Sequence, residues 1–456
     1  MTSEALHPVR AELRALRRLA GPLAITNFGS MLLGVVDTAV VGRVGEVELA
    51  AVGLGNALFF VPWVLGMGWV AGLDPLVAQA IGARERTALD HLWQGAWLGA
   101  VGAVPLMGIA LGLAAALPWL GIDAPTAGET APYLVARCVG MAPSLWLWAT
   151  RSYLSAHEVT RPLLVSVIVA NVVNLPLTYA LVFGDAGLEA LGLPALGVPR
   201  LSTAGAGWAS TVAAGVQLAV CVAAVRALHG PGALRIPRPR LAAIGRILRL
   251  GAPIGFQFLA EAGSFTLVTV LIGQLGPRIL SAHNIALVMI SWTFQAAMAT
   301  GLAASVRVGH AVGRADLAAT RRAGFTAIAA IAALMGSGAV VFVAFPRTLS
   351  GLFTTESGVV EATVPLLAVA AAFQLSDGVQ CVAAGALRGA GDTRWPLVAN
   401  LIGHYAVGVP LGVGLAFGLG GGATGLWWGL SAGLTAVAAA LTIRFHRLSA
   451  REIARA

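Results

Sequence analysis

The chain has 456 residues, of which 58% are apolar and only 11% are charged. Soluble domains carry about 25% charged residues, so this composition excludes an ordinary soluble protein and indicates a membrane protein. The formal net charge of +9 comes from arginine, because the chain contains no lysine. Three cysteines lie in apolar runs without metal-ligand spacing, and we expect them to be small core residues. They are Cys138, Cys221 and Cys381.

Twelve apolar runs have about the length that a helix needs to cross a hydrocarbon core of ~30 Å. In chain order the runs cover residues 20–42, 49–72, 91–117, 131–150, 162–184, 204–227, 250–273, 280–303, 323–345, 363–387, 396–418 and 423–443. Strands of a membrane barrel would alternate in units of about ten residues, so we predict an all-α protein with twelve spans. The first run is too long for the apolar core of a cleavable signal.

The arginines predict the orientation of these spans. The N-terminal tail, the even-numbered connections and the C-terminal tail hold 24 of the 29 arginines, whereas the odd-numbered connections hold four. By the positive-inside rule, both termini are predicted to be cytoplasmic. The connection at 226–249 has six arginines and no acidic residue. This pattern favours a linker that lies against anionic headgroups over a nucleic-acid site.

The second half of the chain repeats the first. A shift of 231 residues aligns 22–82 with 253–313 without a gap, and a shift of 234 aligns 162–184 with 396–418. Each half therefore has six spans and enters the membrane from the same side, which predicts two lobes related by a pseudo-two-fold axis along the membrane normal. Transporters with repeated halves bind substrate between them near the midplane and expose it alternately to the two sides.

The predicted organisation is an N-lobe at 1–228, a cytoplasmic linker at 229–249, and a C-lobe with a cytoplasmic tail at 250–456. Four acidic residues fall inside or directly at the end of the predicted spans: Asp37, Asp74, Glu261 and Asp377. A charged side chain at the centre of a bilayer costs roughly 2.5–3.5 kcal/mol on insertion scales. These carboxylates are therefore candidates for function.

Two of these acids belong to the predicted C-lobe. Polar side chains share a helix face with each of them, namely Gln257 and Ser264 with Glu261, and Gln374 and Gln380 with Asp377. Carboxylate and amide oxygens suit a cation such as Na⁺, and neighbouring carboxylates also favour binding of a proton. The pattern leaves Na⁺ and H⁺ open, with polar contacts between helices as the alternative interpretation.

In the predicted N-lobe, Asp37 lies at a similar depth to Asn171 and Asn174, which predicts a second cation or proton site. Asp74 precedes Pro75 at a span end, where capping of a local helix break is the simpler interpretation. Arg137 is expected to extend towards the interface. Aromatic, methionine and amide side chains in the eighth, tenth and eleventh spans could line a cavity for flat cations or could simply pack. They are Asn284, Met289, Trp292, Phe294, Phe373, Asn400, His404 and Tyr405.

These stretches resemble the MATE (multidrug and toxic compound extrusion) family, in particular its NorM-type bacterial branch. The resemblance rests on "GVVDTAVVGRVG", "LVAQAIGAR", "NVVNLPLTYALVFG", "GAPIGFQFLAEAGSF", "SAHNIAL" and "DGVQCVAAGALRGAGDTRWPLVANLIGHY". It implies a C-lobe cation site at Glu261 and Asp377 and an N-lobe site at Asp37. Two positions depart from the family pattern. Phe373 stands where a tyrosine can occur, and Asp74 stands where a small hydroxyl residue is expected.

The resemblance implies a secondary active antiporter in the bacterial inner membrane. It would export cationic or amphipathic organic compounds in exchange for Na⁺ or H⁺, as a monomer without cofactor or nucleic-acid partner. A lipid-linked oligosaccharide flippase is the alternative, but its cavity should hold several arginines, and only Arg137 lies clearly within a span, away from its ends. An intramembrane enzyme is not expected, because the chain has no DDxxD-type acid cluster and no GxxxxGK[ST] motif.

Overall fold

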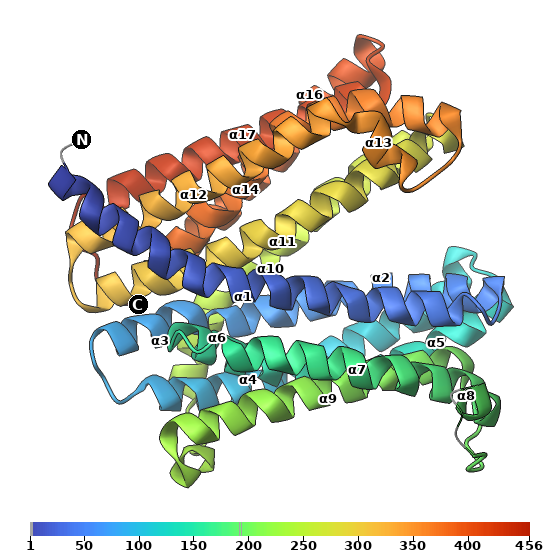
Figure 1. The fold of residues 1–456 in the computed structure, drawn as a ribbon, viewed down its shortest axis with the longest axis horizontal. Helices are drawn as coiled ribbons and strands as arrows, with labels where there is room; N and C mark the ends of the chain where they lie inside the picture. Colours follow the sequence, from blue (N-terminus) through green and yellow to red (C-terminus); the bar gives the residue numbers. More distant parts are fainter. Residues whose placement is uncertain (1–2, 191, 193) are drawn as a thin grey trace. The chain divides into compact units, whose positions relative to one another are not determined.

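The computed structural model describes residues 3–190, 192 and 194–456, and the ordered elements within this part of the chain are all helical (Figure 1). A helix satisfies its own backbone hydrogen bonds, which is what an apolar segment needs in a bilayer. The helices of the first half are α1 (Ser3–Val41), α2 (Glu46–Ala71), α3 (Leu73–Gly82), α4 (Ala88–Ala115), η1 (Leu117–Leu120), α5 (Ala124–Val139), α6 (Met141–Ala156), α7 (Arg161–Phe183), α8 (Asp185–Ala190), α9 (Ser202–His229) and η2 (Pro231–Leu234).

The second half begins with α10 (Leu241–Gly273), a long helix that follows the arginine-rich linker. The remaining helices are α11 (Pro277–Gly313), α12 (Leu317–Ala344), α13 (Pro346–Gly351), α14 (Ser357–Gly389), α15 (Arg394–Leu401), η3 (Ile402–Gly408), α16 (Val409–Val413), η4 (Gly414–Gly418) and α17 (Gly422–Leu448). Both η3 and η4 are π-helical segments.

Among the described residues, eleven helices are long and apolar enough to cross a membrane. The remaining predicted span, at 131–150, is divided between α5 and α6, which are separated only by Gly140. A Cβ added at Gly140 would lie 2.6 Å from Thr211 Oγ1. The close approach of α9 thus explains why a glycine stands at this break.

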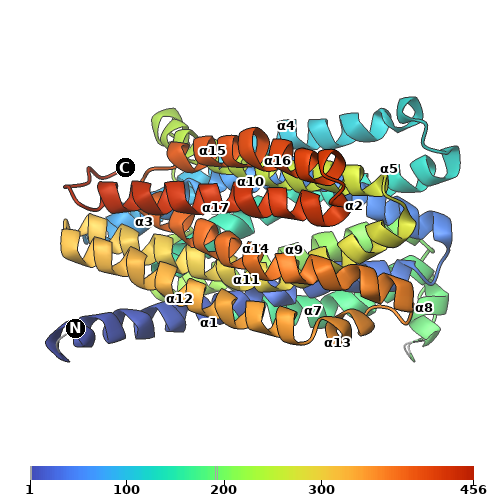
Figure 2. The ribbon, with the colours of Figure 1, turned by 90° about the horizontal axis from the view of Figure 1, so that it is seen from above.

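The chain folds into two compact units. The C-terminal unit comprises the residues up to Ala24, Asp74–Arg86 and Phe256–Ala456, and the N-terminal unit comprises Ile25–Leu73 and Thr87–Gly255. In the C-terminal unit, α14 packs against α11, α12 and α17 (Figure 2). In the N-terminal unit, α9 packs against α5, α6 and α7. The lobe boundaries at 228 and 250 stay a prediction.

Glycines bring the eleventh and twelfth predicted spans very close together. A Cβ on Gly429 of α17 would lie 2.3 Å from the Cα of Gly412 on α16, and one on Gly433 would lie 2.6 Å from the carbonyl oxygen of Gly403. Small residues permit such backbone contact in membranes, where packing rather than water drives helix association. The π-helical segments η3 and η4 flank this contact on either side of α16.

The segment Asp74–Arg86 is fixed to the C-terminal unit by polar contacts with residues far away in the sequence. Gln79 donates its side-chain N–H to the carbonyl oxygen of Gly389 over 3.0 Å, and its Oε1 accepts the backbone N–H of Ala456 over 2.7 Å. Glu12 forms a two-bond ion pair with Arg307 at 2.7 and 2.9 Å. These contacts explain why short pieces of the first half pack with the second.

Candidate functional site

Glu261 of α10 and Asp377 of α14 come together inside the C-terminal unit. Each side chain is 7% exposed, and the two carboxylates lie close enough for their charges to interact. Gln380 donates its side-chain N–H to Glu261 Oε1 over 3.1 Å. The two acids that the sequence singled out separately are thus neighbours, linked through one of the predicted amides.

Several buried polar atoms on this face of α14 have no hydrogen-bond partner among the described residues. They are Asp377 Oδ1, Gln380 Oε1, and both amide atoms of Gln374. An unpaired buried polar atom costs about 1–3 kcal/mol, so native proteins rarely retain several together without a use. Carboxylate and amide oxygens are ligands that hard cations accept. The arrangement can hold a small cation or a proton.

The other predicted residues near this pair have different surroundings. Gln257 is buried one turn before Glu261 on α10. The Ser264 hydroxyl donates to the Glu261 backbone carbonyl over 2.7 Å and also contacts His404 Nδ1 at 3.3 Å. Because Ser264 has a single hydroxyl hydrogen, the His404 contact requires Nδ1 to carry the imidazole proton. His404 therefore lies beside the carboxylate-bearing turn of α10.

The residues proposed for a substrate cavity differ in their surroundings, and their role stays a prediction. Phe373 is fully buried, with its ring centroid 5.8 Å from that of Phe265 and 5.7 Å from that of Trp427, and Met289 belongs to the same apolar core. Phe373 thus has an apolar packing position in which no hydroxyl group is needed. The others differ in burial: Asn400 is buried, Phe294 is half-buried, and Asn284, Trp292 and Tyr405 are exposed.

Asp37 of α1 is the buried acid of the N-terminal unit, with 2% exposure. Ser210 of α9 donates a short hydrogen bond to Asp37 Oδ2, and Thr178 of α7 donates to Oδ1 over 3.3 Å. Asn174 is fully buried beside the same carboxylate, and its amide makes no hydrogen bond of normal geometry within the described residues. Three helices therefore supply polar groups around one acid.

The structure does not bring Asn171 into this cluster. Its side-chain N–H groups donate to the carbonyl oxygens of Gly29 and Val167 over 2.9 and 2.8 Å, which ties α7 to α1 two turns before Asp37. Arg137 does approach the cluster. Its guanidinium lies 4.5 Å from the Phe59 ring centroid and interacts electrostatically with Asp37.

Sequence reasoning missed Ser210, Thr178 and the approach of Arg137. A serine or threonine within an apolar helix usually bonds to a carbonyl of its own helix, so nothing in the local pattern distinguishes these two. Asp74, the acid at the end of the second predicted span, pairs with Arg388 at 3.7 Å, and both side chains are largely buried. No group of three His, Cys, Asp or Glu side chains in the described ranges could hold a metal ion.

The fold and these buried acids define a helical membrane protein of many spans, each half of which carries a polar cluster around a carboxylate. The model of the MatE family matches residues 22–180 and 253–414. The chain belongs to the MatE family.

Curated relatives extend over nearly the whole chain. It is 36% identical over 415 residues to the probable multidrug resistance protein NorM of Deinococcus radiodurans, covering 88% of both chains. It is 37% identical over 445 residues to the corresponding NorM protein of Bradyrhizobium diazoefficiens, covering 95% of this chain and 93% of that protein. The predicted resemblance to NorM-type members is thereby confirmed.

Solved structures agree on the fold. The eukaryotic MATE transporter AtDTX14 superposes with a TM-score of 0.82 at 24% identity, covering 96% of both chains. The Vibrio cholerae MATE transporter VcmN in its bent form gives 0.84 at 18% identity, covering 96% of this chain and 97% of that one. The prediction of an all-helical fold with twelve spans in two halves is confirmed.

Proposed function

We propose that this protein is a secondary active efflux antiporter that exports cationic or amphipathic organic compounds in exchange for Na⁺ or H⁺. The observation that carries the proposal is the buried pair of Glu261 and Asp377, with Gln380 bonded to the first acid and oxygens that lack a partner among the described residues beside the second. Two charges in an apolar unit are costly. A site that binds a coupling ion explains why they are retained.

The cluster around Asp37 supports the same proposal from the N-terminal unit. Its carboxylate is held by hydroxyl groups of α7 and α9, so a change in its charge alters the packing of three helices at once. An ion that binds more tightly in one state than in another shifts the equilibrium between the states. Alternating occupancy of these acids would thereby couple the ion gradient to movement of the substrate.

The names of the curated relatives favour organic toxic compounds as substrates, because those proteins are described as multidrug resistance proteins. We infer a location in the bacterial plasma membrane with both termini cytoplasmic, from the arginine distribution and the bacterial relatives. We further infer that the protein works by transport rather than by enzymatic catalysis. The experiment below distinguishes Na⁺ from H⁺ as the coupling ion.

The test uses everted membrane vesicles and a fluorescent organic cation. A pH gradient and a Na⁺ gradient are imposed in turn, and dye accumulation is compared between vesicles with wild-type protein and with the Glu261→Gln/Asp377→Asn double variant. We expect one of the two gradients to drive accumulation only with wild-type protein. Equal accumulation by the double variant, or no response to either gradient, would overturn the proposal.

A further inference from the structure

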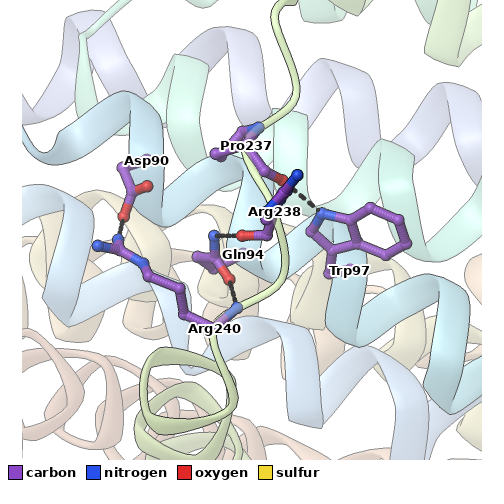
Figure 3. Close-up of polar contacts among 6 residues, drawn as sticks. All are labelled: Asp90, Gln94, Trp97, Pro237, Arg238 and Arg240. Atoms are coloured by element: carbon purple, nitrogen blue, oxygen red, sulfur yellow. Dashed lines mark hydrogen bonds and ion pairs between the residues drawn. The ribbon is translucent and has the colours of Figure 1, made fainter.

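Part of the arginine-rich linker is bound to one face of α4, and Figure 3 shows the contacts at Pro237, Arg238 and Arg240. We call residues 233–241 the strap. Trp93 donates its indole N–H to the carbonyl oxygen of Ala233, and Trp97 donates to that of Pro237, both over 2.9 Å. These two tryptophans are four residues apart and therefore lie on the same side of the helix.

The amide of Gln94, which lies between the two tryptophans on α4, binds the next part of the strap. Its Nε2 donates to the carbonyl oxygen of Arg238 over 3.0 Å, and its Oε1 accepts the backbone N–H of Arg240 over 2.8 Å. The Arg240 side chain also pairs with Asp90, one turn earlier on α4 (Figure 3). The strap thus has its backbone polar groups bound by α4 and is not a flexible tether.

The side chains that the strap presents to its surroundings combine positive charge with apolar surface. Arg235 and Arg238 are exposed and have no acidic partner in the part of the chain that the structure describes, since the acid of this face is bound to Arg240. Ile236 is 55% exposed and Leu241 is 85% exposed. Pro237 and Pro239 favour an extended backbone, which keeps these side chains spread out rather than clustered.

The position of the strap along its neighbouring helices matches the membrane interface. It connects α9, which ends at His229, with α10, which begins at Leu241, and both are candidate membrane spans. Trp93 and Trp97 lie within the first three turns of α4, which starts at Ala88. Tryptophan is enriched at this level of a bilayer, where apolar side chains can enter the headgroup boundary and arginines can meet phosphates.

We propose that the strap is a preformed docking site for anionic phospholipid, with Arg235 and Arg238 on lipid phosphates and Ile236 and Leu241 inserted beside the acyl chains. The bonds to α4 fix the strap before lipid binds, which lowers the entropy cost of the contact. The exposed side chains indicate what binds here. Two guanidinium groups beside two aliphatic side chains suit a phospholipid, which has both a phosphate and acyl chains, better than a fully soluble anion.

The test places an environment-sensitive fluorophore on Ile236→Cys, in a variant whose three native cysteines are replaced by alanine. The full-length protein is reconstituted in nanodiscs of phosphatidylcholine with an increasing fraction of phosphatidylglycerol. We expect a blue shift of the dye that follows the anionic fraction. Arg235→Gln/Arg238→Gln should weaken the apparent affinity roughly 25-fold, about 5-fold for each arginine, so that the shift is lost over the attainable range.

Two further variants separate this site from general charge attraction. Arg447→Gln/Arg451→Gln removes two exposed arginines elsewhere and should leave the shift intact. Trp97→Phe keeps every arginine but removes the bond to Pro237, and should weaken the response. The proposal is overturned if the dye stays in water at all lipid compositions, or if Arg447→Gln/Arg451→Gln loses the blue shift as fully as Arg235→Gln/Arg238→Gln. It is also overturned if millimolar inorganic phosphate produces the same blue shift in neutral nanodiscs. Each result is independent of whether the protein exports drugs.

Discussion

Gln380 donates its amide N–H to Glu261 over 3.1 Å, although 119 residues separate the two along the chain. The bond joins α14 to α10 at the level where each helix carries a buried carboxylate. It leaves Gln380 Oε1 and Asp377 Oδ1 without partners among the described residues. A cation or proton that entered here would meet a site whose geometry is already fixed by packing.

Glu261→Gln and Asp377→Asn should each abolish ion-driven efflux, because each removes one charge from a shared site with little change in volume. The double variant should lose little more efflux activity than either single variant, since the effects of groups that act as a unit are non-additive. Thermal stability in detergent should be unchanged or higher, because a buried charge is lost. Vesicle efflux and melting curves measure both effects.

The matched control is Glu361→Gln on the same helix α14, since Glu361 is exposed and pairs with Arg347. Exposed ion pairs contribute about 0–1 kcal/mol to folding stability. Because this variant stays folded and keeps both buried acids, its efflux should be close to that of the wild type. A double variant that still concentrates drug with the wild-type ion would contradict the role of the acid pair.

Asp37→Asn should impair efflux and leave membrane insertion intact, because the amide keeps the shape and removes the charge. Ser210→Ala should act in the same direction, since it removes a hydrogen bond to a buried carboxylate, worth about 1.5–3 kcal/mol. Ser166→Ala serves as the control, because that buried hydroxyl donates to the carbonyl oxygen of Leu163 on its own helix. Wild-type rate and ion dependence in Asp37→Asn would make Asp37 a structural residue.

Arg388→Gln should lower the melting temperature more than Asp74→Asn does. Removal of one partner from a buried ion pair costs about 3–5 kcal/mol, and the 3.7 Å separation of this pair favours the lower end. Because the amide of Asp74→Asn leaves no buried negative charge, combining it with Arg388→Gln should recover part of the loss. Melting temperatures of the two single variants and the double variant test the pair, and strictly additive losses would argue against it.

Gly429→Ala should destabilise the protein by about 1–3 kcal/mol, because its Cβ would lie 2.3 Å from the Cα of Gly412. Gly336→Ala is the matched change within a helix, since a Cβ at Gly336 meets nothing within 4 Å. That variant should be neutral or stabilised by about 0.5–1 kcal/mol through helix propensity. Equal melting temperatures for the two variants would show that the packing of α16 on α17 has room to relax.

Reporter fusions after residues 240 and 450 should both give cytoplasmic signals, as the arginine distribution predicts. A periplasmic signal at either position would contradict the predicted orientation of the spans.

The sequence by itself determined the class, the spans and the repeat. Hydropathy is a local property, and a run of about 20 apolar residues has to form a helix in a bilayer because its backbone has no other source of hydrogen bonds. An acidic residue inside an apolar run is also recognisable from the local sequence. Asp37, Glu261 and Asp377 could therefore be predicted as candidate functional residues before any packing was known.

Only the tertiary structure decided which side chains surround those acids. Ser210 is 173 residues from Asp37 in the sequence, and Arg388 is far from Asp74, so no periodicity along one helix could connect either pair. Asn171 and Asn174 look equivalent in the sequence, yet only Asn174 lies beside Asp37, because a spacing of three residues rotates a side chain by about 60° relative to its neighbour. The rotation and approach of each helix follow from how whole surfaces pack, and that information is distributed over all the helices.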